Sequence, residues 1–460
     1  MDLKEIFEKQ GKKAILLRHE TISHRLARLS DIVRWIQSNR VLIQQALAED
    51  LHKPSQEADI TEIFPLLSEI RKARKNLKHW ARPVNYPSSL TFLGTSGSLH
   101  YEPKGVCLII SPWNYPLLLT LGPLVSALAA GNTIFLKPSE YTPSTSALIS
   151  KMTNELFDES IVKTVEGDYK VSQELLGMPF NHVFFTGSPE VGKVVMKAAA
   201  SHLASVTLEL GGKSPTIVDE TADISDATMK IAWGKWVNAG QTCVAPDYVF
   251  VHSKVKDDFL AGLTEKAKFL YSEKANYTSI VNERHFERLS AMMNDSNLND
   301  SSLYLSGKVN KSNLTIEPTI YTDVSEEALI MKEEIFGPLL PVIVYDNLEA
   351  VINEINSREK PLALYHFSRS RKIQKKIVEQ TSSGTVVIND CVLQFAHPSL
   401  PFGGVNNSGF GKSHGKFGFQ AFSNEKSVLK QRRGQTMAKL LYPPYNSWKN
   451  KLIDTLIKYF

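Results

Sequence analysis

VCLII, residues 106–110, opens the series of short apolar runs that decides the fold of this chain. A longer helical stretch follows it, then TIFLK at residues 133–137, and this alternation continues downstream. Short apolar runs between helical stretches are typical of buried strands in βαβ units, which build parallel sheets. The later runs of the series lie at residues 161–165, 182–186, 206–210 and 215–219.

The residues directly after each run are candidates for a ligand site, because ligands of parallel sheets bind beyond the carboxyl ends of the strands. SPWNYP follows the first run and carries Trp113 and Asn114. PSE follows the second run and places Lys137 and Glu140 at the same edge. Taken singly these residues are ambiguous, since Asn114 is equally typical of a turn and a lone lysine is usually a solvated charge.

Two further strand ends carry candidate chemistry. GSPEVG, residues 187–192, would open a helix directly after a strand, as a phosphate-binding turn does. It lacks the G-x-G-x-x-G pattern, and an ordinary strand-to-helix turn explains it about as well. Glu209 is more informative, because a carboxylate inside the apolar run VTLEL is costly to bury without a partner or a task. A place on an edge strand is the alternative interpretation of Glu209.

The three cysteines of the 460 residues have no metal-like spacing and do not indicate a disulfide framework. Cys107 lies in an apolar run, and we interpret it and Cys391 as structural thiols. Cys243 lies in WVNAGQTCVAPD, residues 236–247, whose small and polar residues indicate an accessible thiol. An unperturbed thiol is mostly protonated at neutral pH, so the local sequence alone slightly favours an inert cysteine over a nucleophile.

Composition excludes several classes of protein. A chain of 460 residues with 42% hydrophobic and 22% charged residues is typical of a globular protein with two or three domains. The net charge of +5 is small and the charges are mixed, so no nucleic-acid partner is expected. The first residues lack the apolar core of a signal peptide, and the apolar stretch 116–131 is too short to span a bilayer. We therefore expect a cytoplasmic location and a buried helix at 116–131.

The remaining segments complete the expected organisation. Residues 20–80 have helical spacing, whereas 83–97 is rich in Pro, Ser and Gly and contains the pieces of a hairpin arm. Residues 294–313 are predicted to be a surface loop. Glycines crowd LPFGGVNNSGFGKSHG, residues 400–415, as either a ligand loop or a run of surface turns. The tail from Pro443 is an amphipathic helix, predicted to dock on the body or a neighbouring chain, with a membrane surface as the alternative.

SPWNYP, LKPSE, FTGS, LELGGKSP, GQTCVAPD, EEIFGP and LPFGG occur in this order, and together they resemble the aldehyde dehydrogenase superfamily over nearly the whole chain. SHGKFGFQAFSNEKSV, residues 413–428, is similar to the class 3 branch, which includes fatty aldehyde dehydrogenases. The resemblance implies an α/β fold with a Rossmann-like parallel-sheet cofactor domain, an α/β catalytic domain and a bridging hairpin. The implied boundaries are 1–82 with 103–211 for NAD(P) binding, 212–422 for catalysis, 83–102 with 423–432 for the arm, and 433–460 for the tail.

The resemblance also implies roles for single residues. Cys243 matches the nucleophile, Glu209 the general base, and Asn114 the side chain that forms an oxyanion hole with the Cys243 backbone N–H. Two residues depart from the family pattern: Pro189, which removes an N–H from the phosphate turn, and Asn406, which stands where the related loop often has glycine. The implied cofactor contacts are Lys137 and Glu140 at the ribose, Gly187 and Ser188 at the pyrophosphate turn, and Glu334 with Phe336 on the nicotinamide side. Trp113 and Gly192 are also expected to contact the cofactor.

The implied activity is NAD(P)-dependent oxidation of aldehydes, medium- or long-chain aliphatic or aromatic, to carboxylic acids. NAD is the expected cofactor because Glu140 would repel a 2′-phosphate, although class 3 relatives often accept NADP as well. A homodimer is also implied. Three alternatives stay open: a CoA-acylating enzyme, which the presence of Glu209 disfavours; a cofactor-free cysteine hydrolase, for which Cys243 has no evident His partner; and an inactive scaffold.

Overall fold

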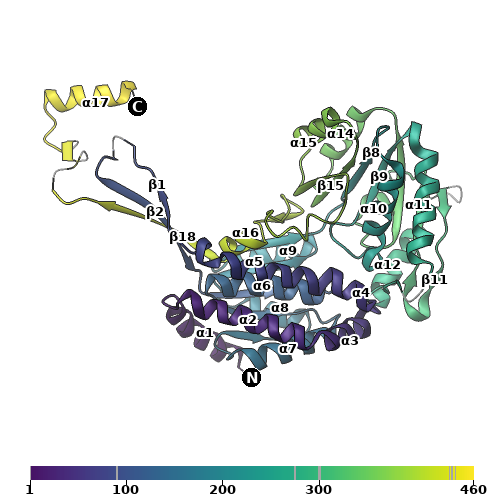
Figure 1. Cartoon of the computed structure of the whole chain (residues 1–460), viewed down its shortest axis with the longest axis horizontal. Coiled ribbons are helices and arrows are strands. Elements are labelled where there is room, and N and C mark those ends of the chain that lie inside the picture. The colour runs from purple at the N-terminus through teal and green to yellow at the C-terminus, as the bar shows by residue number, and fades with distance from the viewer. Residues whose placement is uncertain are drawn as a thin grey trace.

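The computed structural model describes residues 2–89, 92–273, 276–298, 302–434, 436, 439–440 and 442–459. Two sheets with helices packed on them form the body of the protein, and a long arm projects from it (Figure 1). The α/β class expected from the alternating runs is confirmed. No helix among the described residues is long and apolar enough to cross a membrane.

The first sheet has six strands in the order β17-β7-β6-β3-β4-β5. All neighbouring pairs are parallel except β17 with β7. From β3 the chain first adds β4 and β5 on one side and then β6 and β7 on the other, so the direction in which strands are added reverses between β3 and β6. Ligands of α/β sheets bind in the crevice at such a reversal. The strands are β3 (Val106–Ile110), β4 (Thr133–Lys137), β5 (Val162–Thr164), β6 (His182–Gly187), β7 (Ser205–Leu210) and β17 (Gly409–Phe410).

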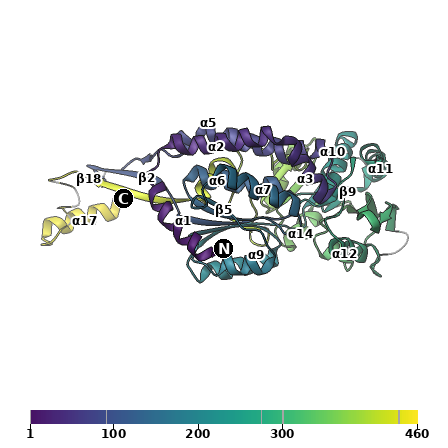
Figure 2. The same ribbon diagram turned by 90° about the horizontal axis from the view of Figure 1, so that it is seen from below.

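Alternate residues of each strand in the first sheet pack against helices on opposite faces. Cys107 and Ile109 of β3 join one buried cluster, while Leu108 and Ile110 join another. Figure 2 shows α5 and α6 on one side of this sheet and α9 on the other. The helices are α1 (Leu3–Leu17), α2 (Ile22–Ser38), α3 (Arg40–Leu51), α4 (Ser55–Ala58), a π-turn at Asp59–Ile63, α5 (Phe64–Trp80), α6 (Pro116–Ala130), α7 (Pro143–Leu156), α8 (Tyr169–Leu176), α9 (Pro189–Ala200) and α16 (Gly415–Ala421). The predicted helices at 20–80 and 116–131 are therefore confirmed.

The second sheet has seven strands in the order β10-β13-β14-β9-β8-β15-β16. The apolar run predicted at residues 215–219 forms β8 of this sheet. A large cluster of buried side chains lies between the second sheet and the helices that pack on it. Its strands are β8 (Pro215–Val218), β9 (Tyr248–His252), β10 (Leu303–Leu305), β13 (Thr319–Thr322), β14 (Leu339–Tyr345), β15 (Ala363–Phe367) and β16 (Thr385–Ile388). Its helices are α10 (Ile224–Trp236), α11 (Lys256–Tyr271), α12 (Glu283–Met293), α13 (Leu329–Lys332), α14 (Leu348–Ser357) and α15 (Arg371–Gln380).

The predicted surface loop at 294–313 is only partly a loop. Its described part contains β10, which extends the second sheet, and β11 (Val309–Asn310), which pairs with β12 (Thr315–Ile316). Pairing of Val309 with the buried Ile316 gives this short ribbon an apolar contact. The polar composition of the segment concealed these strands.

The arm joins two distant parts of the chain. β1 (Val84–Tyr86), β2 (Thr95–Pro103) and β18 (Ser423–Gln431) form an antiparallel sheet in which Ser423 pairs with Pro103. The tail helix α17 (Ser447–Tyr459) lies near the end of this arm, away from the body (Figure 1). It has no buried residue, so docking of the tail on the body of its own chain is wrong. The last residue of the tail, Phe460, lies outside the described residues.

Candidate active site

A left-handed turn delivers Cys243 from the end of α10. Asn238 and Ala239 have φ of 54° and 53°, and Gly240 follows with φ of 75°. The Asn238 side chain donates to the carbonyl of Gln241, 3.1 Å away, and the Gln241 side chain donates to the Asn238 carbonyl at 3.0 Å. A Cβ on Gly240 would lie 2.2 Å from the Gly337 carbonyl oxygen, so only glycine fits there.

Residues from the carboxyl end of β3 hold the cysteine loop. The Asn114 side chain donates to the Gln241 carbonyl at 3.0 Å, and the Tyr115 hydroxyl lies 2.6 Å from the Thr242 hydroxyl. Asn114 is therefore beside the Cys243 loop, with one of its two amide hydrogens engaged. It is not among the residues that line the cavity described below.

A buried ion pair beneath the loop was not foreseen from the sequence. Lys53 Nζ lies 2.6 Å from Glu62 Oε1, and both side chains are fully buried. The other carboxylate oxygen of Glu62 accepts the N–H groups of Leu117 and Leu118 in the first turn of α6. Lys53 also donates to the Asn114 carbonyl at 3.3 Å. In the sequence, the only indication of this ion pair is the presence of charged residues within the helical pattern of 50–70.

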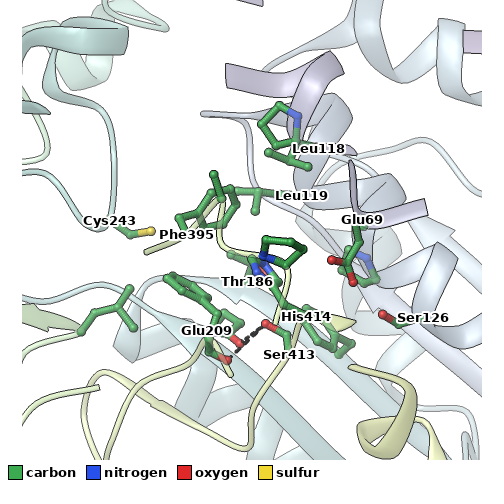
Figure 3. Close-up of a pocket in the computed structure, with 18 of the residues that line it drawn as sticks. Glu69, Leu118, Leu119, Ser126, Thr186, Glu209, Cys243, Phe395, Ser413 and His414 are labelled. Atoms are coloured by element: carbon green, nitrogen blue, oxygen red, sulfur yellow. Dashed lines mark hydrogen bonds between the residues drawn. The ribbon is translucent and has the colours of Figure 1, made fainter. Parts of the chain in front are cut away.

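Cys243 lies at one end of a mostly apolar cavity between α5, α6 and the carboxyl ends of β6 and β7 (Figure 3). Cys243 is half-buried, which confirms an accessible thiol, whereas Cys107 and Cys391 are buried. The cavity is lined by Pro65, Glu69, Leu118, Leu119, Gly122, Pro123, Ser126, Phe184, Thr186, Glu209, Leu210, Cys243, Leu362, Phe395, Ala396, Pro398, Phe402, Ser413 and His414.

Glu209 shares this cavity. Its strand β7 is paired on both sides at this position, with Thr186 of β6 and Gly409 of β17, so the edge-strand interpretation is wrong. The Ser413 hydroxyl donates to Glu209 Oε1 at 2.8 Å, and Oε2 is buried without a hydrogen-bond partner among the described residues. Burial raises the pKa of Glu209 to about 8. A carboxyl group with that pKa can accept a proton near neutral pH.

The electrostatics of the site oppose spontaneous ionisation of the thiol. Burial, and then the nearby carboxyls of Glu334 and Glu209, raise the pKa of Cys243 above its ordinary value. The backbone N–H groups of Cys243 and Val244 act in the opposite direction. The thiol therefore needs a neighbouring base to become a nucleophile.

The glycine-rich segment, residues 400–415, contributes side chains to the lining of the same cavity. Phe402, Ser413 and His414 from this segment are lining residues, so it is more than a run of surface turns. Asn406 adopts a left-handed φ of 57°, a conformation that asparagine tolerates, and its side chain accepts a hydrogen bond from Lys360. The unusual backbone angles expected here are confirmed at Gly403, Gly409, Gly411 and Gly415, all with positive φ.

The candidate cofactor residues lie at the reversal point of the first sheet. β6 ends at Gly187, and Ser188 caps α9 by accepting the Val191 N–H at 3.4 Å. Pro189 is the first residue of α9, where a missing N–H costs no helical hydrogen bond. A Cβ on Gly192 would lie 2.8 Å from the side chain of Leu210, so glycine lets α9 pack closely on β7.

Lys137 is not a solvated charge, since its side chain is only 2% exposed. It donates to the Pro138 carbonyl at 3.0 Å and pairs with Glu140 at 2.9 Å. This ion pair places the partly exposed Glu140 carboxylate at the carboxyl end of β4, next to the strand that leads to Asn114. A ribose hydroxyl is a suitable partner for such a pair, and the α9 N-terminus suits an anion.

An aromatic cluster faces the same edge. The Trp113 ring lies 5.4 Å from Phe336, nearly perpendicular to it, and 4.9 Å from His285. Phe336 has a left-handed φ of 45°. Burial, and then Arg288 and Arg284, lower the pKa of His285 to about 4, so this imidazole is neutral. His285 lies on a helix far from every motif, and nothing in its local sequence singled it out.

One ion pair connects three motifs, LELGGKSP with Glu209, GQTCVAPD with Cys243 and EEIFGP with Phe336. Lys213 pairs with Asp247 and also donates to the carbonyls of Ile330 and Glu333 at 2.9 and 2.8 Å. The other carboxylate oxygen of Asp247 accepts the Ile335 N–H at 2.9 Å. The neighbouring Glu334 carboxyl lies over Gly211, where a Cβ would be 2.1 Å from Oε2. Burial and then Asp247 raise the pKa of Glu334 to about 8.

The sequence is similar to those of known aldehyde dehydrogenases over most of its length. Residues 2–428 match the model of the "Aldehyde dehydrogenase family". The 4,4'-diaponeurosporen-aldehyde dehydrogenase of Staphylococcus aureus is 42% identical over 99% of this chain and 98% of its own length. "Aldehyde dehydrogenase family 3 member B1" of Homo sapiens is 41% identical over 93% of this chain and 92% of its own length.

Solved structures agree with the sequence relatives. The "Substrate bound state of Staphylococcus Aureus AldH" has a TM-score of 0.94 at 40% identity, covering 99% of this chain and 100% of that one. An NAD+ complex of an aldehyde dehydrogenase from Bacillus cereus has a TM-score of 0.81 at 29% identity, covering 90% and 85%. A glyceraldehyde-3-phosphate dehydrogenase from Methanocaldococcus jannaschii complexed with NADP has a TM-score of 0.84 at 27% identity, covering 93% and 94%.

The shifted pKa of Cys243 predicts a distinctive alkylation profile. The rate of Cys243 modification by iodoacetamide should be low at neutral pH and should still rise above pH 9, because only the thiolate reacts. Removing the Glu209 charge with Glu209→Gln should move this profile to lower pH. Mass spectrometry of the alkylated peptide measures both, and the buried Cys107 is the internal control. A profile centred on the pH of an ordinary thiol would contradict the electrostatics described above.

Proposed function

Because the chain belongs to the aldehyde dehydrogenase family and is an NAD(P)-dependent aldehyde dehydrogenase, we propose that Cys243 is its nucleophile and Glu209 its general base. The observation that carries this proposal is that both side chains line one cavity, at the carboxyl ends of strands that lead to the candidate cofactor residues. Class 3 members are similar to it over most of its length.

An aldehyde cannot release hydride until its carbonyl carbon becomes tetrahedral, so a nucleophile must add first. In this proposal the Cys243 thiolate adds to the carbonyl carbon, and the free Asn114 amide hydrogen together with the Cys243 N–H binds the oxyanion. Loss of one such donor typically costs about 3 to 4 kcal/mol in the transition state. When bound, the nicotinamide supplies the hydride acceptor that turns the thiohemiacetal into a thioester.

Glu209 then serves thioester hydrolysis. Its unpartnered Oε2 is suited to take a proton from water, and the raised pKa keeps the carboxyl close to half-ionised near pH 8. Ser413 holds the other oxygen and so orients the group. A base in this place supports water rather than CoA as the acceptor of the acyl group. Distinguishing acid from acyl-CoA products tests that point.

The cofactor assignments follow the sheet reversal. The N-terminus of α9 supports pyrophosphate binding, the Lys137–Glu140 pair supports a ribose contact, and the Trp113–Phe336 pair supports a nicotinamide face. A carboxylate at Glu140 disfavours a 2′-phosphate, so NAD is the preferred cofactor while NADP is accepted. The residues proposed as cofactor contacts are Trp113, Lys137, Glu140, Gly187, Ser188, Gly192, Glu334 and Phe336.

Substrate class, location and domain boundaries are part of the same proposal. The apolar lining of the cavity supports medium- or long-chain aliphatic or aromatic aldehydes, and the three free thiols support a cytoplasmic location. The cofactor domain is proposed to span 1–82 and 103–211, and the catalytic domain 212–422. The exposed tail helix, in 433–460, is proposed to contact a neighbouring chain, with a membrane surface as its alternative partner.

The first prediction concerns the nucleophile. Cys243→Ala should lower aldehyde oxidation by at least about 1000-fold, because no other thiol among the described residues lines the cavity. NAD binding should persist, measured by calorimetry, since Cys243 is not a proposed cofactor contact. Cys107→Ala is the matched control and should stay active. Substantial oxidation of aldehydes by the Cys243→Ala variant would contradict the proposed role of Cys243 as the nucleophile.

The second prediction concerns the base. Glu209→Gln should give a burst of NADH followed by steady-state turnover about 100- to 1000-fold slower, because thioester hydrolysis loses its base. In the unaltered enzyme, turnover limited by hydrolysis should rise with pH through about 8 as Glu209 ionises, and the variant should lack this rise. Stopped-flow absorbance measures both. Glu333→Gln, at an exposed neighbour of Glu334, is the control; unchanged turnover of Glu209→Gln at every pH would remove Glu209 as base.

The third prediction concerns assembly. We infer a homodimer bridged by the arm, 83–102 with 423–432, whose Tyr86 and Leu429 are exposed apolar side chains. Light scattering should give twice the chain mass of 51.5 kDa. Leu429→Asp should shift the mass towards that of one chain, whereas Lys430→Ala should not. A single-chain mass for the unaltered protein would contradict the proposal.

A further inference from the structure

The cavity extends well beyond Cys243 along two helices. On α6 its lining residues recur at helical spacing from Leu118 to Ser126, and on α5 Pro65 is followed one turn later by Glu69. Tyr115, which contacts the cysteine loop, lies just before α6. At 1.5 Å per residue, Ser126 is about 16 Å further along that helix. Figure 3 shows Glu69 and Ser126 on the opposite side of the cavity from Cys243.

This remote end of the cavity is polar, and the proposed reaction does not use it. Glu69 is 9% exposed and accepts the Gly415 N–H at 2.6 Å through Oε1. Within the described residues, no group donates to Glu69 Oε2, and the Ser126 hydroxyl, 6% exposed, makes no hydrogen bond either. Both residues are about nine-tenths buried or more, and both line the cavity, so their unpartnered oxygens identify a place where a ligand group can bind.

Most of the other residues that line the cavity are apolar. They include Leu118, Phe184, Leu210, Phe395 and Phe402. His414 stacks on Phe402, and burial lowers the pKa of this imidazole to about 4, so it carries no charge at neutral pH. The shape and polarity match an apolar chain or ring with an aldehyde at one end and a hydrogen-bonding group at the other.

We propose that Glu69 and Ser126 form a specificity subsite for a hydroxyl group at the end of the substrate remote from the aldehyde. This proposal rests on the proposed role of Cys243, which places the aldehyde at the other end. The substrate hydroxyl donates to Glu69 Oε2 and accepts from Ser126 Oγ, so both unpartnered groups are satisfied at once.

A hydroxyl fits this subsite better than a charged group does. A remote carboxylate on the substrate would lie against the carboxyl of Glu69, and a remote ammonium would have only this partly neutral carboxyl to offset its lost hydration. Burial raises the pKa of Glu69 to about 7, so near neutral pH this carboxyl carries less negative charge than an exposed one. The favoured substrates are therefore hydroxylated aldehydes with an apolar middle.

The test compares alkanals with alkanals of the same length that carry a hydroxyl at the far end, each across a range of lengths. With NAD, kcat/KM at the best-fitting length should favour the hydroxylated aldehyde by about tenfold. Ser126→Ala should bring this ratio close to one, mainly by lowering kcat/KM for the hydroxylated aldehyde. Glu69→Gln, which keeps an oxygen for the Gly415 N–H, should also reduce the ratio.

Thr120→Val is the matched control, because the Thr120 hydroxyl is buried and unpartnered on the same helix but does not line the cavity. It should keep the preference for the hydroxylated aldehyde. Equal kcat/KM for both aldehydes at every length, or an equal loss with both in Ser126→Ala, would overturn the subsite.

Binding to the Cys243→Ala variant separates the subsite from the proposed reaction. Calorimetry of this variant should give a dissociation constant about tenfold lower for the hydroxylated aldehyde than for the alkanal. Such a preference would support the subsite even if Cys243→Ala retained activity and the proposed mechanism failed. Equal dissociation constants would overturn the subsite even if the mechanism held.

Discussion

The left-handed turn at Asn238, Ala239 and Gly240 is the constraint on which the site depends. A positive φ at a non-glycine residue costs on the order of 1 kcal/mol or more, and two such residues occur here in succession. Side-chain hydrogen bonds of Asn238 and Gln241 offset this cost, and Asn114 adds a bond from the first sheet. The turn carries Cys243 from the end of α10, which packs on the second sheet, towards Glu209 on β7 of the first sheet.

Two ion pairs, one fully buried and one mostly buried, make this arrangement stiff. Lys53 and Glu62 brace the first turn of α6 from below, and Lys213 and Asp247 tie the cysteine loop to the segment before β14. Each pair also satisfies backbone groups in short helices, at helix ends or in loops. Because losing one partner of a buried pair leaves an uncompensated charge, these residues couple the shape of the site to the stability of the fold.

Much of the architecture was predictable from local pattern. Apolar runs at 106–110 and 133–137 correspond to β3 and β4 residue for residue, and the motifs pointed to Cys243 and Glu209, whose common cavity the structure reveals. What local pattern could not supply were contacts between distant segments: Ser413 with Glu209, and His285 with Trp113. Their partners are defined only by the folded chain, and an isolated serine or histidine has no periodicity to reveal it. Docking of the tail on its own body was wrong for a related reason, since amphipathicity indicates an apolar face but not what covers it.

The pairing of β2 with β18 has a consequence for biosynthesis. β2 lies in the first quarter of the chain, whereas its partner strand lies close to the other terminus, and β17 likewise adds late residues to the edge of the first sheet. Contacts between segments so far apart in sequence form slowly during folding. During translation, the early strands also leave the ribosome long before their partner strands have been synthesised. β2 is therefore an unpaired strand edge on the nascent chain for most of translation, open to pairing with other molecules until β18 emerges.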